Sequence, residues 1–139
     1  MKLVGILGGG QLARMLALAS HSLGLRVRVF DPAPDAAAAA VAEHICAPWD
    51  DVAAIARFCE GLEVATLEFE SVPLATALAV AAKVRLAPSV RALAATQDRL
   101  AEKQLALNLG IPATPFANIE CIDDIERAAR QIGFPAVLK

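Results

Sequence analysis

The chain has 139 residues, a net charge of −2 and 57% hydrophobic residues. This length suits one ordinary domain with a real core, together with the beginning of a second. The near-neutral charge and the absence of a basic run exclude the electrostatic footprint of a nucleic-acid or membrane-surface binder. No apolar stretch approaches the roughly eighteen residues of a membrane helix, and no targeting signal is recognisable at the N-terminus. Cys46, Cys59 and Cys121 are odd in number and widely spaced, which is typical of unpaired thiols in a reducing cytosol.

The first ten residues lead from a short apolar run into three successive glycines, Gly8 to Gly10, and then directly into a helical pattern. Glycines let backbone N–H groups approach an anion closely, and the start of a helix favours negative charge. The pattern predicts a phosphate or nucleotide cradle, with a plain tight turn as the alternative. The apolar residues of the helix fall on one stripe: Leu12, Met15, Leu16, Ala19 and Leu23.

Strand and helix patterns then alternate along the chain. We expect strands at 25–30, 43–46, 64–67 and 84–86, and helices at 36–42, 52–59, 73–82 and after Ser89. The strands are nearly continuously apolar, as buried parallel strands are. The alternation predicts an α/β fold with a Rossmann-like, open, mostly parallel sheet that helices cover on both faces.

The character of the chain changes at Gln97. A more charged helix is expected at 98–108, and a second helix is expected to begin at Asp123 or Asp124. A new strand is expected at 136–139. We place a domain boundary near residues 90–97, and the second unit looks unfinished. The residues expected to face inward around the second helix are Ile122, Ile125, Ala129 and Ile132.

One interpretation of the glycine turn is a dinucleotide site. Gly8, Gly10 and Ala13 fit the pattern G-x-G-x-x-G/A after a strand, and Asp31 ends the second strand, where a ribose-binding acid would lie. This favours the NAD(P)-binding Rossmann domain of an oxidoreductase. However, any doubly wound domain with a glycine-rich first turn matches the same pattern, and Asp-Pro is also a common exit from a strand.

Two acidic residues, Glu68 and Glu70, end the strand at 64–67. In an extended strand alternate residues face the same side, so both carboxylates are expected to project together, with Phe69 opposite. Ligands of open α/β sheets bind at the carboxyl edge, where a carboxylate can accept hydrogen bonds from ribose hydroxyls. A solvated pair of acids is the alternative. A metal site is disfavoured because neither a His nor a third acid accompanies the pair.

Two cations near the end of the chain are further candidates. Lys139 follows an apolar run, and a lysine in that position is costly to bury without an anionic partner. Arg99 lies forty positions earlier on the charged helix, where a solvated face is the alternative.

Five motifs occur in order: GILGGGQLARM, EFESVP, QDRLAEK, LGIP and PAVLK. Together they resemble the N-terminal part of the N5-carboxyaminoimidazole ribonucleotide synthetases, an ATP-grasp family of purine biosynthesis, and the resemblance covers about 2–139. A related ATP-grasp formyltransferase that acts on glycinamide ribonucleotide shares the general layout. The triple glycine followed by Gln-Leu, and the Glu-Phe-Glu run, favour the carboxylating family.

The resemblance implies a pre-ATP-grasp ribonucleotide-binding domain at 1–95, and a connecting helix with the truncated start of an ATP-grasp domain at 96–139. It implies that Glu70, with Glu68 as a second candidate, binds the ribose of the substrate. Arg99 and Lys139 match two ATP contacts of the family, with Lys139 at the phosphates. The residues implied near the substrate's 5′-phosphate are Gly9, Gly10, Gln11 and Leu12.

The implied reaction is the ATP-dependent carboxylation of 5-aminoimidazole ribonucleotide with bicarbonate, which gives N5-carboxyaminoimidazole ribonucleotide, ADP and phosphate and requires Mg2+. The family's ATP lid, adenine-binding residues and Mg2+ ligands belong beyond Lys139. We therefore expect no catalytic residue and no metal ligand within these residues, and no activity from them alone. The resemblance also implies a cytoplasmic homodimer. A regulatory domain that binds neither ligand is a third possibility.

Overall fold

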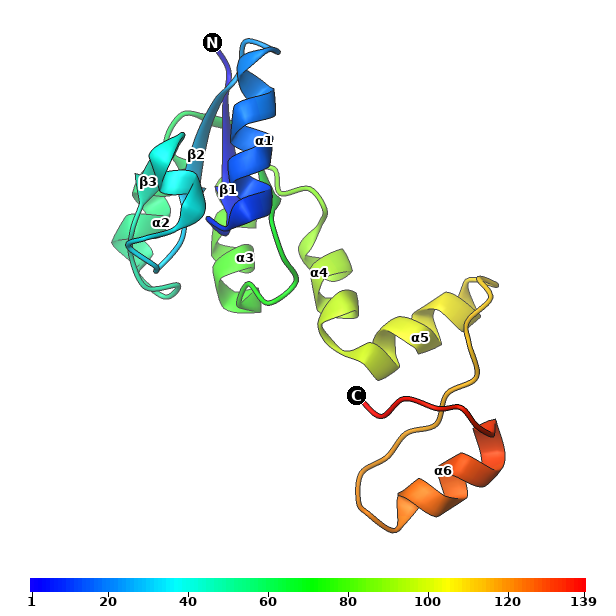
Figure 1. The fold of residues 1–139 in the computed structure, drawn as a ribbon. Coiled ribbons are helices and arrows are strands. Elements are labelled where there is room, and N and C mark those ends of the chain that lie inside the picture. Colours follow the sequence, from blue (N-terminus) through cyan, green and yellow to red (C-terminus); the bar gives the residue numbers. More distant parts are fainter. The chain divides into compact units, whose positions relative to one another are not determined.

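The computed structural model describes residues 1–139 and divides into two compact units, Met1–Gln97 and Asp98–Lys139. The first unit is an α/β domain, and the second contains helices and loops only (Figure 1). No helix in either unit is both long enough and apolar enough to span a membrane.

A four-stranded parallel sheet in the order β3-β2-β1-β4 forms the centre of the first unit. The central strand β1 places Leu7 opposite Phe30 of β2 and Leu67 of β4. This confirms the predicted open, parallel α/β sheet. The strands are β1 (Leu3–Leu7), β2 (Arg26–Phe30), β3 (Glu43–Ile45) and β4 (Leu62–Leu67).

The predicted strand at 84–86 is reduced to a single parallel bridge between Leu86 and Ala65. The predicted helix at 36–42 is likewise reduced, to a 3-10 helix at Ala37–Ala40.

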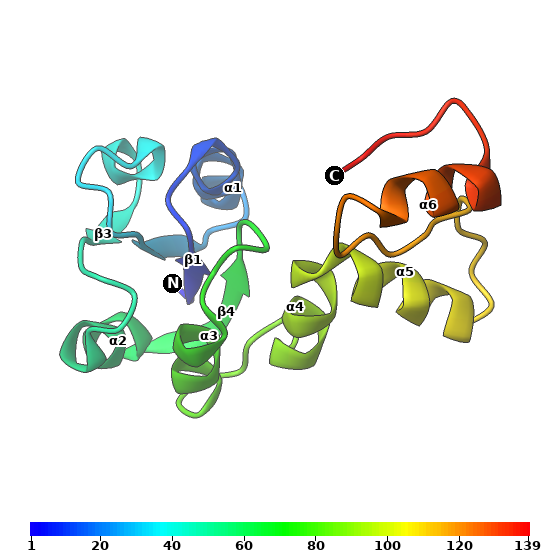
Figure 2. The ribbon, with the colours of Figure 1, turned by 90° about the horizontal axis from the view of Figure 1, so that it is seen from below.

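Helices cover both faces of the sheet, as predicted. Figure 2 shows α1 and the 3-10 helix on one face, and α2 and α3 on the other. Local capping fixes where two of the helices begin, because Asp51 accepts the Ala54 N–H at the start of α2 and Ser89 accepts the Ala92 N–H at the start of α4. The helices are α1 (Gln11–His21), α2 (Val52–Cys59), α3 (Leu74–Ala81) and α4 (Val90–Gln97).

The main core lies on the α2 and α3 side of the sheet. The rings of Phe30 and Phe58 meet edge to face with centroids 5.7 Å apart, and both side chains are fully buried. Val72 and Val80 complete the centre of this cluster. A smaller cluster on the α1 side is formed by Ile6, Ala13, Val29 and Ala38.

Helix α1 lies against the sheet through small residues and not through its apolar stripe. Ala13, Ala17 and Ser20 are buried, whereas Leu12 is 57% exposed and Met15 is 62% exposed. The stripe of large residues identified in the sequence is therefore not the core-facing surface of the helix. Small side chains allow the helix backbone to approach the strands closely, and that approach turns the adjacent row of large side chains outward.

The second unit contains α5 (Arg99–Asn108) and α6 (Asp124–Ile132). Asp98 caps α5 by accepting the Ala101 N–H. Two predictions fail here. Ile122 and Ile125, which were expected to face inward, are 80% and 41% exposed, Ala129 and Ile132 are half-buried, and Ala128 is the buried residue of α6. Residues 136–139 form no strand, because the unit offers no neighbouring strand to pair with.

Candidate functional site at the carboxyl edge of the sheet

The glycine loop between β1 and α1 is tightly packed against the strands beside it. Gly8 has φ +105°, a conformation that favours glycine, and its N–H donates to the Phe30 carbonyl at 2.9 Å. A Cβ on Gly9 would lie 2.8 Å from the Ala36 Cβ and 2.9 Å from the Asp31 Cβ. The loop therefore requires glycine for reasons of packing, whether or not a ligand binds.

Two carboxylates accept hydrogen bonds from the other two glycine N–H groups of this loop. Asp31 Oδ2 accepts the Gly9 N–H at 2.8 Å, and Glu68 Oε2 accepts the Gly10 N–H at 2.7 Å. The other Asp31 oxygen accepts the Ala33 N–H, also at 2.8 Å. In this structure the glycine N–H groups thus point to protein acceptors and do not form an open anion cradle.

Within the predicted phosphate cradle, the first turn of α1 is the part that remains open to a ligand. Gly10 is the N-cap of the helix, no side chain caps its N–H groups, and the first turn contains no acidic residue. Gln11 and Leu12 are both exposed. Free N–H groups and the positive end of the helix dipole together favour an anion at this turn.

Glu68 and Glu70 play different parts. Strand β4 ends at Leu67, so residues 68–70 form a bend and a turn, and the prediction that both carboxylates project together with Phe69 opposite is wrong. Glu68 turns inward to the glycine loop, whereas Glu70 is exposed and its carboxylate makes no hydrogen bond or ion pair. The Phe69 ring lies 6.3 Å from that of Trp49. Glu70 is therefore the acid that remains available to a ligand at this edge.

Gln97 is a residue of this edge that sequence reasoning did not single out. Its Nε2 donates to the carbonyls of Glu70 and Val72, each at 2.8 Å. The contact joins the end of α4 to a turn 25 and 27 positions earlier in the chain. No local pattern in the sequence signals a contact of this separation.

In the second unit, Arg99 and Lys139 line a single pocket of about 660 Å³, although forty positions separate them in the sequence. Arg99 Nη1 pairs with Glu102 Oε2 at 2.6 Å. Lys103 also lines the pocket, where its Nζ donates to Thr114 Oγ1 at 3.0 Å and lies 5.4 Å from the Phe116 ring centroid. The sequence could have identified Lys103 as a pocket residue, because a spacing of four residues from Arg99 places both cations on one face of α5.

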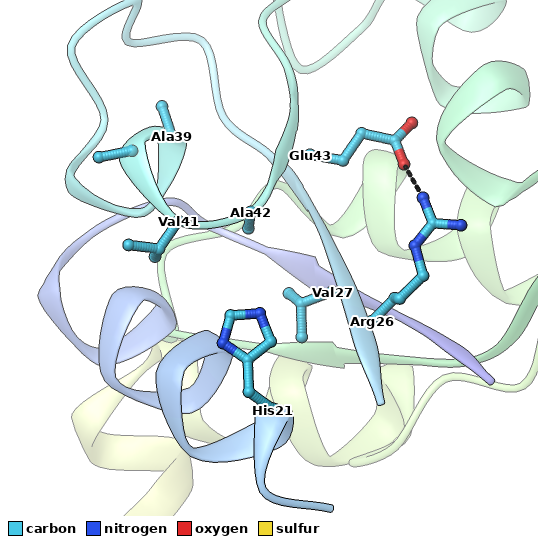
Figure 3. Close-up of a pocket in the computed structure, with 8 residues that line it drawn as sticks. His21, Arg26, Val27, Ala39, Val41, Ala42 and Glu43 are labelled. Carbon is cyan, nitrogen blue, oxygen red and sulfur yellow. Dashed lines mark ion pairs between the residues drawn. The ribbon is translucent and has the colours of Figure 1, made fainter. Parts of the chain in front are cut away.

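A hollow of about 350 Å³ lies at the opposite, amino edge of the sheet (Figure 3). His21 and Val27 line it, and the Arg26 and Glu43 side chains pair beside it with 3.7 Å between their closest atoms. Arg26 and Glu43 begin their strands, so this hollow is separate from the edge that carries the glycine loop. In neither unit is there a group of three or more His, Cys, Asp and Glu residues that could hold a metal ion.

Comparison with known proteins gives a consistent result. Residues 1–97 match the family model of the ribonucleotide synthetase preATP-grasp domain. The N5-carboxyaminoimidazole ribonucleotide synthase of Pseudomonas aeruginosa is 43% identical over 136 residues, which is 98% of this chain and 38% of that protein. This chain thus spans less than two fifths of that relative's length.

Solved structures show the same similarity. The N5-carboxyaminoimidazole ribonucleotide synthetase of Thermus thermophilus superposes with a TM-score of 0.85 and 44% identity, over 95% of this chain and 37% of that one. An Aspergillus clavatus N5-carboxyaminoimidazole synthase, solved in complex with ADP and 5-aminoimidazole ribonucleotide, gives a TM-score of 0.81 and 27% identity. That similarity covers 96% of this chain and 37% of the Aspergillus chain.

Proposed function

This chain belongs to the ribonucleotide synthetase preATP-grasp domain family, and we propose that it supplies the N-terminal part of an N5-carboxyaminoimidazole ribonucleotide synthetase. The reaction is the ATP-dependent carboxylation of 5-aminoimidazole ribonucleotide with bicarbonate, which releases ADP and phosphate in de novo purine biosynthesis. The observation that carries the proposal is the pairing of an exposed, unpartnered Glu70 carboxylate with an uncapped first turn of α1 at the same edge of the sheet.

These two features bind the two polar parts of the ribonucleotide, its phosphate and its ribose. Its phosphate lies at the first turn of α1, where the N–H groups of Gln11 and Leu12 and the helix dipole neutralise negative charge. Its ribose hydroxyls donate to the Glu70 carboxylate. The Glu68–Gly10 hydrogen bond fixes the shape of the site beside the ligand, where Gly9, Gly10 and Glu68 lie.

The second unit contributes to ATP binding. Arg99 and Lys139 present positive charge to one pocket, with Lys139 at the ATP phosphates. Bound ATP supplies the phosphoryl group that activates bicarbonate. The residues of this chain hold and orient the two nucleotides, and the gain from such positioning is large when reacting groups are brought into alignment. Mg2+ ligation belongs to parts of the enzyme other than these 139 residues, which we expect to be inactive alone.

The oxidoreductase alternative finds no support. Both carboxylate oxygens of Asp31 accept backbone N–H groups, from Gly9 and from Ala33, so this acid has a structural role in the loop without a dinucleotide. The relatives described above are named as ribonucleotide synthases, not as oxidoreductases. We further propose that the protein is a homodimer, and that it is cytoplasmic, a location in keeping with the free thiols of Cys46, Cys59 and Cys121.

ADP formation tests the proposal in a protein of the relatives' full length that contains these residues. ADP should form with ATP, Mg2+ and bicarbonate only when 5-aminoimidazole ribonucleotide is present, and Glu70→Ala should abolish that dependence. Glu63→Ala is the matched control, because Glu63 is an exposed acid of β4 whose one ion pair, with Lys2, is at the surface. ADP formation that ignores the ribonucleotide, or that Glu70→Ala leaves unchanged, would overturn the proposal.

A further inference from the structure

We propose that Gln97 is a positioning residue for the ribonucleotide, which holds the backbone of the Glu70 turn in the form that presents the Glu70 carboxylate. Both hydrogens of its side-chain amide are used, one for the Glu70 carbonyl and one for the Val72 carbonyl, each at 2.8 Å. The inference rests on the proposed function and adds a residue to that same site.

Apart from Gln97, the contacts that anchor the turn lie on either side of Glu70. Before it, the Glu68 N–H donates to the Leu7 carbonyl at 2.9 Å, and the Glu68 carboxylate accepts from Gly10. After it, Val72 is fully buried in the main core. Between these anchors Glu70 and Ser71 are exposed, and Gln97 supplies the hydrogen bond to the Glu70 backbone.

Gln97 acts from a fixed support. Helix α4 is held to the main core by Leu93, which is 2% exposed, and by Val90, which packs against the same cluster. The backbone from which the Gln97 side chain extends is therefore held in a fixed position. Among neutral side chains, only glutamine combines this length with two donors on one nitrogen. Glutamate in its place would have no donor and would repel the two carbonyl oxygens.

This arrangement predicts a selective kinetic defect. Removal of the amide frees the Glu70 turn to sample other conformations, and ordering it again on binding costs free energy that the ribonucleotide must supply. The residues proposed to contact ATP, Arg99 and Lys139, are not part of this turn. The KM for the ribonucleotide should therefore rise while the KM for ATP does not.

The test compares Gln97→Ala and Gln97→Glu with Thr96→Val in the full-length enzyme. Thr96 is the preceding residue, and its hydroxyl donates to the Leu93 carbonyl within α4, so it controls for changes to the helix end. In both Gln97 variants the KM for 5-aminoimidazole ribonucleotide should rise about tenfold, the factor that corresponds to one or two ordinary hydrogen bonds. The KM for ATP should be unchanged, and Thr96→Val should match the parent enzyme.

Amide hydrogen exchange provides a second readout that does not depend on turnover. In Gln97→Ala the amides of residues 69–72 should exchange faster, while those of β1 and β2 keep their protection. Unchanged exchange at 69–72 together with an unchanged ribonucleotide KM would overturn the inference, as would equal rises in both KM values. If the parent enzyme itself shows no ribonucleotide-dependent ADP formation, the proposed function fails, and the exchange data alone then decide whether Gln97 holds the turn.

Discussion

The two units of this chain differ in what fixes their functional residues. All the buried apolar side chains except Ala128 lie in residues 1–97, where the core holds the glycine loop and the Glu70 turn in place. In residues 98–139, Phe134 and Val137 are 83% and 80% exposed. The contacts within this unit include a helix cap, exposed ion pairs and the contacts of Lys103 with Thr114 and Phe116. The sheet edge that carries the glycine loop and Glu70 is therefore built by tertiary packing within its own unit. Arg99 and Lys139 instead line a pocket in a unit that has one buried apolar side chain, Ala128.

Separation of the units should produce the largest contrast. Residues 1–97 alone should unfold in a single cooperative transition, because they contain their own core. Residues 98–139 alone should show no cooperative transition, since one buried alanine cannot offset the conformational entropy of some forty residues. Thermal unfolding followed by circular dichroism makes the measurement. A sharp transition in 98–139 would show that the second unit has a stable core of its own and would contradict the contrast between the units.

One large-to-small substitution in each unit should have very different effects on the free energy of unfolding. Phe58→Ala removes a fully buried ring from the main core and should lower the free energy of unfolding by about 3–5 kcal/mol. Ile122→Ala removes a side chain that is 80% exposed and should change it by less than about 0.5 kcal/mol. Urea denaturation monitored at Trp49 reports the first, and the helical signal of the second unit reports the other. Similar costs at the two positions would contradict the account.

Arg28 offers a smaller test within the first unit. Its guanidinium donates to the carbonyls of Arg57, Phe58 and Glu60 at the end of α2, and pairs with Glu43 at 2.8 Å. Arg28→Met should cost about 1–3 kcal/mol, because these carbonyls lose a charged donor. The control is Arg26→Met, which breaks only the exposed 3.7 Å pair with Glu43 and should cost less than about 1 kcal/mol. Equal losses in urea denaturation would show that the α2 cap contributes nothing.

The smallest expected effect concerns pH in the second unit. The backbone N–H groups of Glu120 and Cys121 hold the pKa of Asp124 below its usual value of 3.8. A folded-state pKa that is lowered means that the contribution to stability is present above the usual pKa and is lost as pH falls below it. The helical chemical shifts of α6 should therefore decline below about pH 3.8, and Asp124→Asn should remove that step. An identical acid profile in the variant would contradict the assignment.

Local features of this fold could be predicted from sequence, and long-range ones could not. The strand–glycine–helix turn and the caps formed by Asp51, Ser89 and Asp98 depend on neighbouring residues, so patterns reveal them. The hydrogen bond from Gly10 to Glu68 joins residues 58 positions apart, and its geometry depends on where β4 ends.

Sequence patterns fail where packing decides which of two adjacent helix faces is buried, or whether a strand has a neighbouring strand to pair with. The apolar stripe of α1 and its buried face of small residues lie side by side on one helix, and periodicity alone does not say which one meets the sheet. The predicted strand at 136–139 has the right composition but no neighbouring strand in its unit. Glu68 and Glu70 were correctly placed at the sheet edge, yet their different orientations follow from a turn that the alternation rule does not describe.

The most direct test of the central claim is an NMR titration of the 15N-labelled 139-residue chain with 5-aminoimidazole ribonucleotide and, separately, with NAD. We expect the ribonucleotide to shift the amide resonances of Gln11, Leu12 and Glu70, and Glu70→Ala to weaken this binding. NAD should leave the same amide resonances unmoved. Shifts at Gly8 to Ala13 and at Asp31 caused by NAD, with none caused by the ribonucleotide, would contradict this expectation and would assign the glycine loop to a dinucleotide.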